Sequence, residues 1–275
     1  MSLLDDLAGA RWAPTWFRRR AIGWLGYRVV HEATFPGGSL RVIERGSVRR
    51  LRFGDAWEDQ SAIDRAAPTW PLLPYTHLAT IGLALPPRLD GVLHLGLGGG
   101  SLARMVHAAA PDAQQHAVER YDEVVDVARR YFDLPESVSV TVGDAALLVD
   151  RLARAYDLVF LDAFSPSGAP VSQSEATFTR VRRLLRPDGW LVVNVTDDVR
   201  ALVAALHRVF ASVAWIKLAD TEQYVLVASD AAHLTGVRAR ALALGAHLAT
   251  DVEPLVDCLV WAHGSLLATP RTAEL

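Results

Sequence analysis

The sequence predicts an α/β protein with a Rossmann-like, mostly parallel sheet and a small N-terminal β subdomain. From residue 91 onward, short β-rich segments alternate with helical patterns at the spacing of βαβ units. Such alternation requires parallel pairing, with helices on both faces of the sheet. Before that point, residues 39–54 alternate apolar with basic side chains around Gly46 and Ser47, which predicts a β-hairpin.

The order of the segments predicts each element of the sheet. Strands are expected at residues 92–95, 115–119, 138–142, 158–161 and 190–195, and helices at 101–110, 122–132, 145–153 and 175–185. A helix at 199–210 and an antiparallel pair of strands at 213–218 and 224–228 complete a seven-stranded, class I methyltransferase-like sheet. Two further helices are expected, one that begins after Pro74 and runs to Leu85, and one over 237–248.

These elements divide the chain into three expected parts. Residues 1–74 form an N-terminal helical segment and the small β subdomain, residues 75–230 form the domain with the large sheet, and residues 231–275 form a C-terminal helical extension and tail.

Composition narrows the class of protein. Apolar residues make up 51% of the 275 residues and charged residues 21%, which is typical of a folded globular chain. The formal net charge of -3 does not provide the basic field of a nucleic-acid binder, so no such partner is expected. With Cys258 as its single cysteine and no uncharged apolar run of about 18 residues, the chain is expected to be cytoplasmic, without disulfide, metal site or membrane span.

A glycine cluster follows the first predicted strand of the large sheet and precedes a helix. Its glycines allow positive φ and close approach of a ligand to amide groups at the helix N-terminus, and they are Gly96, Gly98, Gly99 and Gly100. Glu119 ends the next strand about 20 residues later, where a carboxylate can accept both hydroxyls of a ribose. Together the two features predict an adenosyl ligand.

Two other interpretations of the glycine cluster remain open. The first is dinucleotide binding, but the cluster reads GxGGG where a dinucleotide fingerprint reads GxGxxG, and the sheet ends in an antiparallel pair of strands. The second is a glycine-rich turn that serves only packing.

Acidic residues also follow the next two strands. Asp144 is placed to bind an exocyclic adenine amine or to cap the helix that begins at Ala145. Asp162 lies at the carboxyl end of a strand, the edge at which open α/β sheets bind ligands, and it can be a general base, an anchor for a cation or the cap of a turn. His94, in mid-strand, is expected to be a hydrogen-bonded core histidine.

The motifs occur in a specific order along the chain, namely DQSA (59–62), PYTH (74–77), VLHLGLGGGSLARMV (92–106), VERYDEVV (118–125), VGDA (142–145), LDAFSPSGAP (161–170) and LRPDGWLVVNV (185–195). With these motifs, residues from about 40 to 228 resemble the spermidine/spermine synthase (polyamine aminopropyltransferase) family, especially its divergent bacterial spermidine synthase-like branch.

The resemblance implies an activity and a set of site residues. It implies aminopropyl transfer from decarboxylated S-adenosylmethionine to a small-molecule amine, with release of methylthioadenosine, a role in polyamine biosynthesis and a homodimer. Asp162 corresponds to the catalytic base. The implied residues for the adenosyl ligand are Gln60, Gly96, Gly98, Gly99, Gly100, Glu119, Asp144 and Ala145, and those for the substrate are Tyr75, His77 and Ser165.

The chain also departs from the family pattern. Gly99 replaces the loop Asp that holds the aminopropyl ammonium, Ser165 replaces the second Asp of D-x-x-D-P, and Thr76 with His77 replaces a His-Glu pair. Because charge-assisted hydrogen bonds are about twice as strong as neutral ones, these losses weaken binding of a polyamine. The leading hypothesis is aminopropyl transfer to a short amine. The alternatives are methyl transfer from S-adenosylmethionine and a non-catalytic adenosyl-binding homologue.

Overall fold

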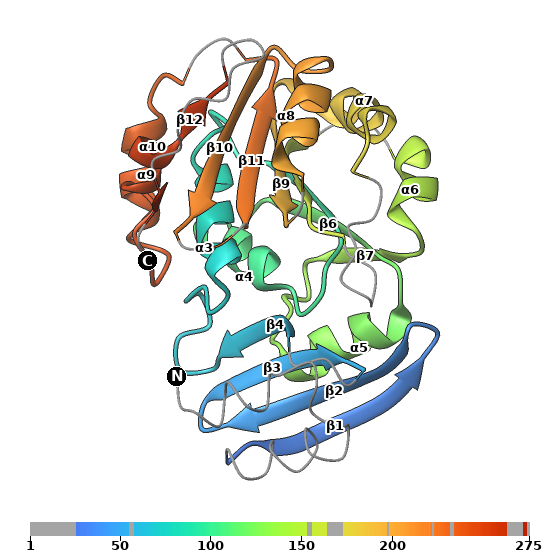
Figure 1. Ribbon diagram of the computed structural model, residues 1–275. Coiled ribbons are helices and arrows are strands. Elements are labelled where there is room, and N and C mark those ends of the chain that lie inside the picture. Colours follow the sequence, from blue (N-terminus) through green and yellow to red (C-terminus); the bar gives the residue numbers. More distant parts are fainter. Residues whose placement is uncertain are drawn as a thin grey trace.

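The computed structural model describes residues 26–54, 58–152, 156–163, 173–196, 198–219, 221, 223–231, 234–262 and 272–273. Two sheets form the framework, a four-stranded N-terminal sheet and a larger nine-stranded sheet (Figure 1). No helix in the described ranges combines the length and the apolar character that a membrane crossing requires.

The large sheet contains the seven predicted strands, which are β5 (Gly91–Leu95), β6 (Gln114–Glu119), β7 (Ser139–Val142), β8 (Tyr156–Leu161), β9 (Leu185–Val195), β10 (Ser212–Leu218) and β11 (Tyr224–Ser229). Their spatial order is β10-β11-β9-β8-β5-β6-β7, with β5 to β9 parallel and β11 antiparallel to both β9 and β10. The class I methyltransferase-like fold is therefore confirmed. Two short strands that the sequence did not predict, β12 (Val260–Trp261) and β13 (Thr272–Ala273), also pair with β10.

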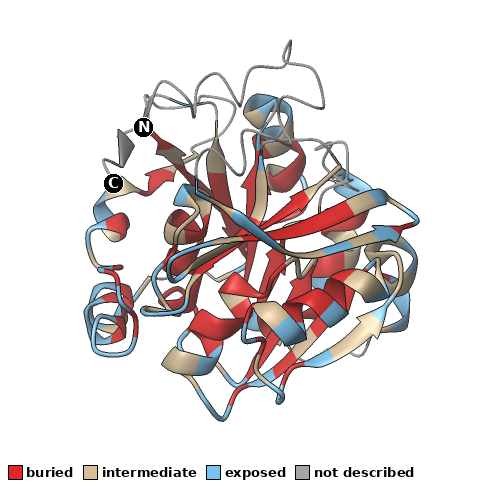
Figure 2. Ribbon diagram, turned by 90° about the horizontal axis from the view of Figure 1, so that it is seen from below, coloured by how far each residue is buried: buried red, intermediate tan, exposed pale blue. Residues whose placement is uncertain are grey.

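Helices cover both faces of this sheet, and buried side chains concentrate along its strands (Figure 2). One face packs against α3 (Pro74–Ala79), α4 (Ser101–Ala109), α9 (Val237–Leu244) and α10 (Leu255–Cys258). The other packs against α7 (Glu175–Leu184) and α8 (Val199–His207). Side chains alternate between the faces, since Val92 belongs to the first cluster and Leu93 to the second.

Four predicted helices end at least three residues earlier than expected, and the one over 199–210 ends at His207. The helix over 145–153 is α6 (Ala145–Leu148) followed by the 3-10 turn η2 (Val149–Arg151), and the helix after Pro74 is α3 followed by the 3-10 turn η1 (Thr80–Leu83). Within η1, a Cβ on Gly82 would lie 2.6 Å from Val192 Cγ2, so the turn packs directly on the sheet because this residue has no side chain. The helix over 237–248 ends at Leu244.

The N-terminal sheet is an antiparallel meander of β1 (Arg28–Phe35), β2 (Gly38–Arg45), β3 (Val48–Phe53) and β4 (Asp59–Asp64). The predicted hairpin is β2 with β3, whereas β1 and β4 were not predicted. The apolar side chains of the meander pack against α5 (Asp122–Tyr131) in a cluster that includes Leu40, Leu51, Ile63, Val127 and Phe132. This packing holds the N-terminal sheet beside α5 (Figure 1).

Candidate functional site

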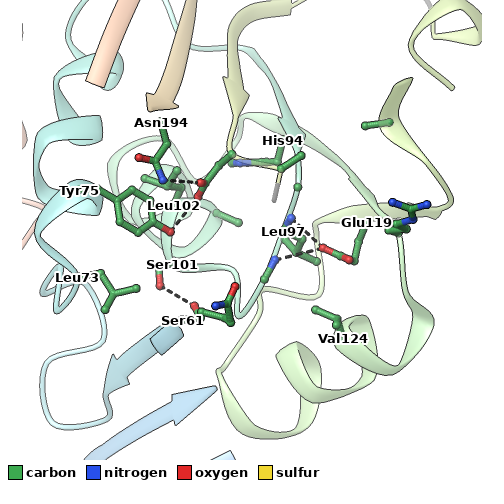
Figure 3. Close-up of a pocket in the computed structure, with 18 of the residues that line it drawn as sticks. Ser61, Leu73, Tyr75, His94, Leu97, Ser101, Leu102, Glu119, Val124 and Asn194 are labelled. Carbon is green, nitrogen blue, oxygen red and sulfur yellow. Dashed lines mark hydrogen bonds between the residues drawn. The ribbon is translucent and has the colours of Figure 1, made fainter. Parts of the chain in front are cut away.

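A cavity of about 550 Å³ lies at the carboxyl ends of β5, β6, β8 and β9, and residues of β4 and α3 also line it. This is the edge at which ligands bind in open α/β sheets. Figure 3 shows Glu119 beside the glycine loop, while Tyr75 and Asn194 lie together in another part of the site. Most of the residues that the sequence singled out therefore share one cavity.

The glycine loop after β5 requires glycine at its first position. Gly96 has a φ of 95°, and a Cβ there would lie 2.3 Å from the carbonyl oxygen of Asp162. Gly96 N–H donates to Val118 O at 2.9 Å. No other residue type fits here without displacing the β8 end, so this glycine allows β5 and β8 to approach each other.

The remaining glycines have different surroundings. Gly98 lines the cavity, with the Gln60 carbonyl oxygen 3.6 Å from where its Cβ would lie. A Cβ on Gly99 would lie 2.7 Å from Ser61 Oγ, and one on Gly100 would lie 2.7 Å from Leu134 Cδ1. These last two glycines are absent from the described lining and face packed side chains behind the loop.

Arg104, which the sequence analysis missed, supports the loop from behind. Its side chain is buried, and it donates to Gly99 O at 2.6 Å, to Phe132 O at 2.5 Å and to Ser101 Oγ at 3.1 Å. Burial lowers the pKa of its guanidinium to about 10, so the group stays charged at neutral pH. It thereby ties the loop to the segment after α5.

Glu119 accepts hydrogen bonds from the backbone of the glycine loop and from the backbone that follows β6. Its Oε2 accepts from Leu97 N–H at 3.1 Å and Gly98 N–H at 3.3 Å, and its Oε1 accepts from Tyr121 N–H at 3.2 Å. Burial raises the pKa of Glu119 above its ordinary value, although these amides act to lower it. The carboxylate and the loop amides thus face the same space.

Asp144 and Ala145 line the cavity next to Glu119. Asp144 Oδ1 accepts from Ala146 N–H at 2.8 Å and so caps α6, while its Oδ2 lies 3.6 Å from Nη2 of Arg120. The cap uses one oxygen, so a contact between the other and a ligand amine stays compatible with it.

Asp162 follows β8 and lies where its backbone N–H donates to Leu95 O at 3.0 Å. The phenol of Tyr75 donates to its Oδ2 at 2.9 Å, and Nδ2 of Asn194 donates to its Oδ1 at 2.9 Å. Burial raises the pKa of Asp162, and the hydrogen bonds from Asn194 and Tyr75 oppose this shift. Burial and the charge of Asp162 raise the pKa of Tyr75 well above its ordinary value, so the phenol stays protonated.

Three other residues that the sequence analysis named are His77, Ser165 and His94. His77 is absent from the described lining, and its Nε2 lies 3.2 Å from Asp251 O. Two helical steps of about 100° turn it away from Tyr75, and its role at the substrate stays a prediction. Ser165 lies outside the described residues. His94 is a satisfied core histidine as expected, since it is 2% exposed and its Nε2 lies 3.0 Å from Gln115 Oε1.

Several polar residues of the cavity were not anticipated. They are Ser61, Ser101, Asn194, Thr196 and Gln223. Ser61 Oγ lies 3.3 Å from Ser101 Oγ, below Tyr75 in Figure 3. Asn194 carried a signal in the sequence, because it is a polar residue within the apolar segment LVVNV.

Comparison with known sequences agrees with this geometry. A family described as "Methyltransferase domain" matches residues 92–189. A polyamine aminopropyltransferase of Chromobacterium violaceum is 32% identical over 173 residues, which cover 61% of this chain and 65% of that protein. A probable polyamine aminopropyl transferase of Bifidobacterium longum is 32% identical over 143 residues, which cover 50% of this chain and 32% of that protein. The resemblance to the polyamine aminopropyltransferases is confirmed.

The matches span less than two thirds of these relatives' own lengths. Methyltransferases match as well. A Drosophila melanogaster protein named eEF1A lysine and N-terminal methyltransferase homolog is 29% identical over 161 residues, which cover 52% of this chain and 24% of that protein.

Solved structures share the fold at low identity. A probable spermidine synthase from Corynebacterium glutamicum has a TM-score of 0.69 at 19% identity, with 90% of this chain and 98% of that chain covered. A spermidine synthase in complex with the transition-state analogue AdoDATO has a TM-score of 0.60 at 17% identity, with 76% of each chain covered. Human methyltransferase-like protein 13 in complex with SAH has a TM-score of 0.55 at 24% identity, with 64% and 92% covered.

Proposed function

We propose that the protein transfers an aminopropyl group from decarboxylated S-adenosylmethionine to an amine and releases methylthioadenosine, with Asp162 as general base. The observation that carries this proposal is the common cavity of the glycine loop, Glu119 and the Asp162 carboxylate. The relatives named polyamine aminopropyltransferase support the same chemistry.

The adenosyl part of the donor lies at the glycine loop. Glu119 accepts the ribose hydroxyls, the loop at Gly96 and Gly98 allows close approach of the ligand, and Asp144 with Ala145 borders the adenine. Gln60, on β4, lines the cavity opposite Gly98. This arrangement directs the sulfonium toward Asp162.

The transfer needs one positioned base. An acceptor ammonium gives a proton to Asp162, and the lone pair of the resulting amine attacks the carbon beside the sulfonium. The new N–C bond forms while the C–S bond breaks, and its electron pair remains on sulfur as the neutral thioether. A base with a raised pKa takes this proton more readily, which fits the buried position of Asp162. Tyr75 holds the second carboxylate oxygen in place.

A second candidate is methyl transfer from S-adenosylmethionine in the same cavity. Gly99 provides no carboxylate for an aminopropyl ammonium, and Ser61 already occupies the space into which a side chain there would extend. The methyltransferase relatives favour this candidate too.

Calorimetry with the two sulfonium compounds tests the proposal, followed by identification of the nucleoside product after incubation with short amines. We expect tighter binding of the decarboxylated donor and release of methylthioadenosine. Preference for the carboxylated donor, with S-adenosylhomocysteine as product, would establish methyl transfer instead. Binding of methylthioadenosine without turnover of any amine would leave a non-catalytic adenosyl-binding protein.

A further inference from the structure

Polar side chains form a line across the ends of three neighbouring strands. In the sheet order, β11, β9 and β8 are adjacent, with Asn194 paired to Val225 and Val193 paired to Leu161. Asp162 therefore follows β8 directly beside Asn194, and Gln223 precedes β11 on the other side. The register of the sheet brings these three residues together.

Hydrogen bonds along this line have a defined direction. Gln223 Nε2 donates to Asn194 Oδ1 at 3.4 Å, and Asn194 Nδ2 donates to Asp162 Oδ1 at 2.9 Å. A flipped amide at position 194 would place its oxygen against the carboxylate and its NH₂ against another NH₂ donor. The carboxylate, which only accepts, thus requires Asn194 to donate, and Gln223 donates to the amide oxygen that remains.

The backbone of Asn194 is also held. Gln173 Nε2 donates to the carbonyl oxygen of Asn194 at 2.7 Å, and Asn194 is 7% exposed. A buried amide with its backbone, its oxygen and its nitrogen all engaged keeps a single conformation, which is what alignment of a base requires.

We propose that Asn194 is the positioning residue for Asp162, with Gln223 as the residue that holds the oxygen of its amide. This inference rests on the proposed function, in which Asp162 is the base. Because a hydrogen bond to a carboxylate favours the charged form, Asn194 favours the ionised base and opposes the effect of its burial. Tyr75 engages the other oxygen, so the two donors together orient the plane of the carboxylate.

The other titratable groups of the described lining do not replace this role. Tyr75 from α3 and His94 from β5 are both uncharged at neutral pH, since burial raises the pKa of the first and lowers the pKa of the second to about 4. Glu119 from β6 is bound to the loop amides. The lining also contains Glu58, Asp59, Arg120, Tyr121 and Asp144, and the groups that shift the pKa of Asp162 are Asn194 and Tyr75. The electrostatic influence on Asp162 from β9 therefore comes through the Asn194 amide.

The pH profile of amine turnover tests the inference. Asn194→Leu keeps a similar volume without a donor, and we expect the acidic limb of kcat/KM to move up by about one pH unit, a roughly tenfold loss below the limb that recovers above it. Asn194→Asp places a like charge beside the base and should move the limb further. Gln223→Leu should give a smaller shift in the same direction.

Ser229→Ala is the matched control, because it removes a buried hydrogen bond to Gly189 O from β11 outside the described lining of the cavity. It should lower stability and leave the limb in place. An acidic limb that Asn194→Leu does not move overturns the inference.

A titration of the Asp162 carboxyl by carbon-13 NMR separates this inference from the proposed function. If the wild-type protein turns over no amine, the proposed function fails, and the NMR titration still decides the role of Asn194. A higher pKa of Asp162 in Asn194→Leu than in the wild type supports that role, and an equal pKa refutes it.

Discussion

Glu119 and Asp162 are carboxylates that follow or end the two strands flanking β5, and burial raises the pKa of both. They differ in what holds them. Glu119 accepts from backbone amides of the loop and of Tyr121, whereas Asp162 accepts from the side chains of Tyr75 and Asn194.

This difference separates binding from chemistry. Backbone amides stay in place under most substitutions, so the Glu119 end keeps its geometry, and in the proposed function it binds the nucleoside. The Asp162 end depends on side chains from α3 and β9, each of which can change independently. In the proposed function, the residues that depart from the spermidine synthase pattern, Gly99, Ser165 and His77, belong to the positions for the tail of the donor or the amine. The proposal is therefore more specific about the adenosyl ligand than about the amine.

The largest expected effect is on turnover, which should depend on Asp162 much more strongly than nucleoside affinity does. Asp162→Asn should reduce turnover by about 10²- to 10⁴-fold, the usual contribution of a general base, and change methylthioadenosine affinity only a few-fold. Steady-state kinetics and calorimetry on the same preparation measure both quantities. Full retention of turnover would show that Asp162 is not the base.

Gly96 lies between the Glu119 end and the Asp162 end of the cavity. Its replacement should have the second largest effect, which is a loss of stability. Gly96→Ala combines a φ of 95° with a contact of 2.3 Å to Asp162 O, so we expect a loss of about 3 kcal/mol in the free energy of unfolding. Gly98→Ala is the matched control, since its Cβ would meet its nearest atom at 3.6 Å, and it should cost only about 1–2 kcal/mol from its positive φ. Equal losses in urea unfolding would contradict the close approach at Gly96.

Glu119→Gln should weaken nucleoside binding by about 10- to 100-fold, because a hydrogen bond to a charged acceptor contributes about 1.5–3 kcal/mol. Turnover at saturating donor should change far less than in Asp162→Asn. A Glu119→Gln protein that binds methylthioadenosine like the wild type would remove the ribose contact from the proposal.

The smallest expected effect is a pH dependence of nucleoside binding. The pKa of Glu119 lies above its ordinary value of 4.5, so protonation begins at a higher pH than for an exposed glutamate and removes the charged acceptor for the ribose. Affinity for the nucleoside should therefore fall, by up to about tenfold, as the pH decreases through the raised pKa. The affinity of Glu119→Gln should stay flat over the same range, and parallel curves would assign the dependence to another group.

Much of the site could be predicted because it depends on local order in the sequence. The glycine loop, Glu119 and Asp162 each follow an apolar strand, and parallel strands bring their carboxyl ends to one edge. The error in helix length had a local cause too. The helix predicted over 145–153 begins at Ala145 but ends early, because helical propensity alone does not reveal where an α-helix tightens into a 3-10 turn. The role of His77 at the substrate stays a prediction from the resemblance, although the period of α3 directs its side chain away from Tyr75.

The sequence by itself determined the α/β class, the positions of the seven strands along the chain and the closeness of the glycine loop to Glu119, because hydrophobic period and glycine spacing are local properties. The tertiary structure decided which side chains surround Asp162, and it revealed Arg104 behind the loop and Ser61 against Gly99. Asn194 and Tyr75 reach the same carboxylate from positions 32 and 87 residues away along the chain. Contacts over such separations follow from strand register and helix packing, which residue spacing alone does not encode.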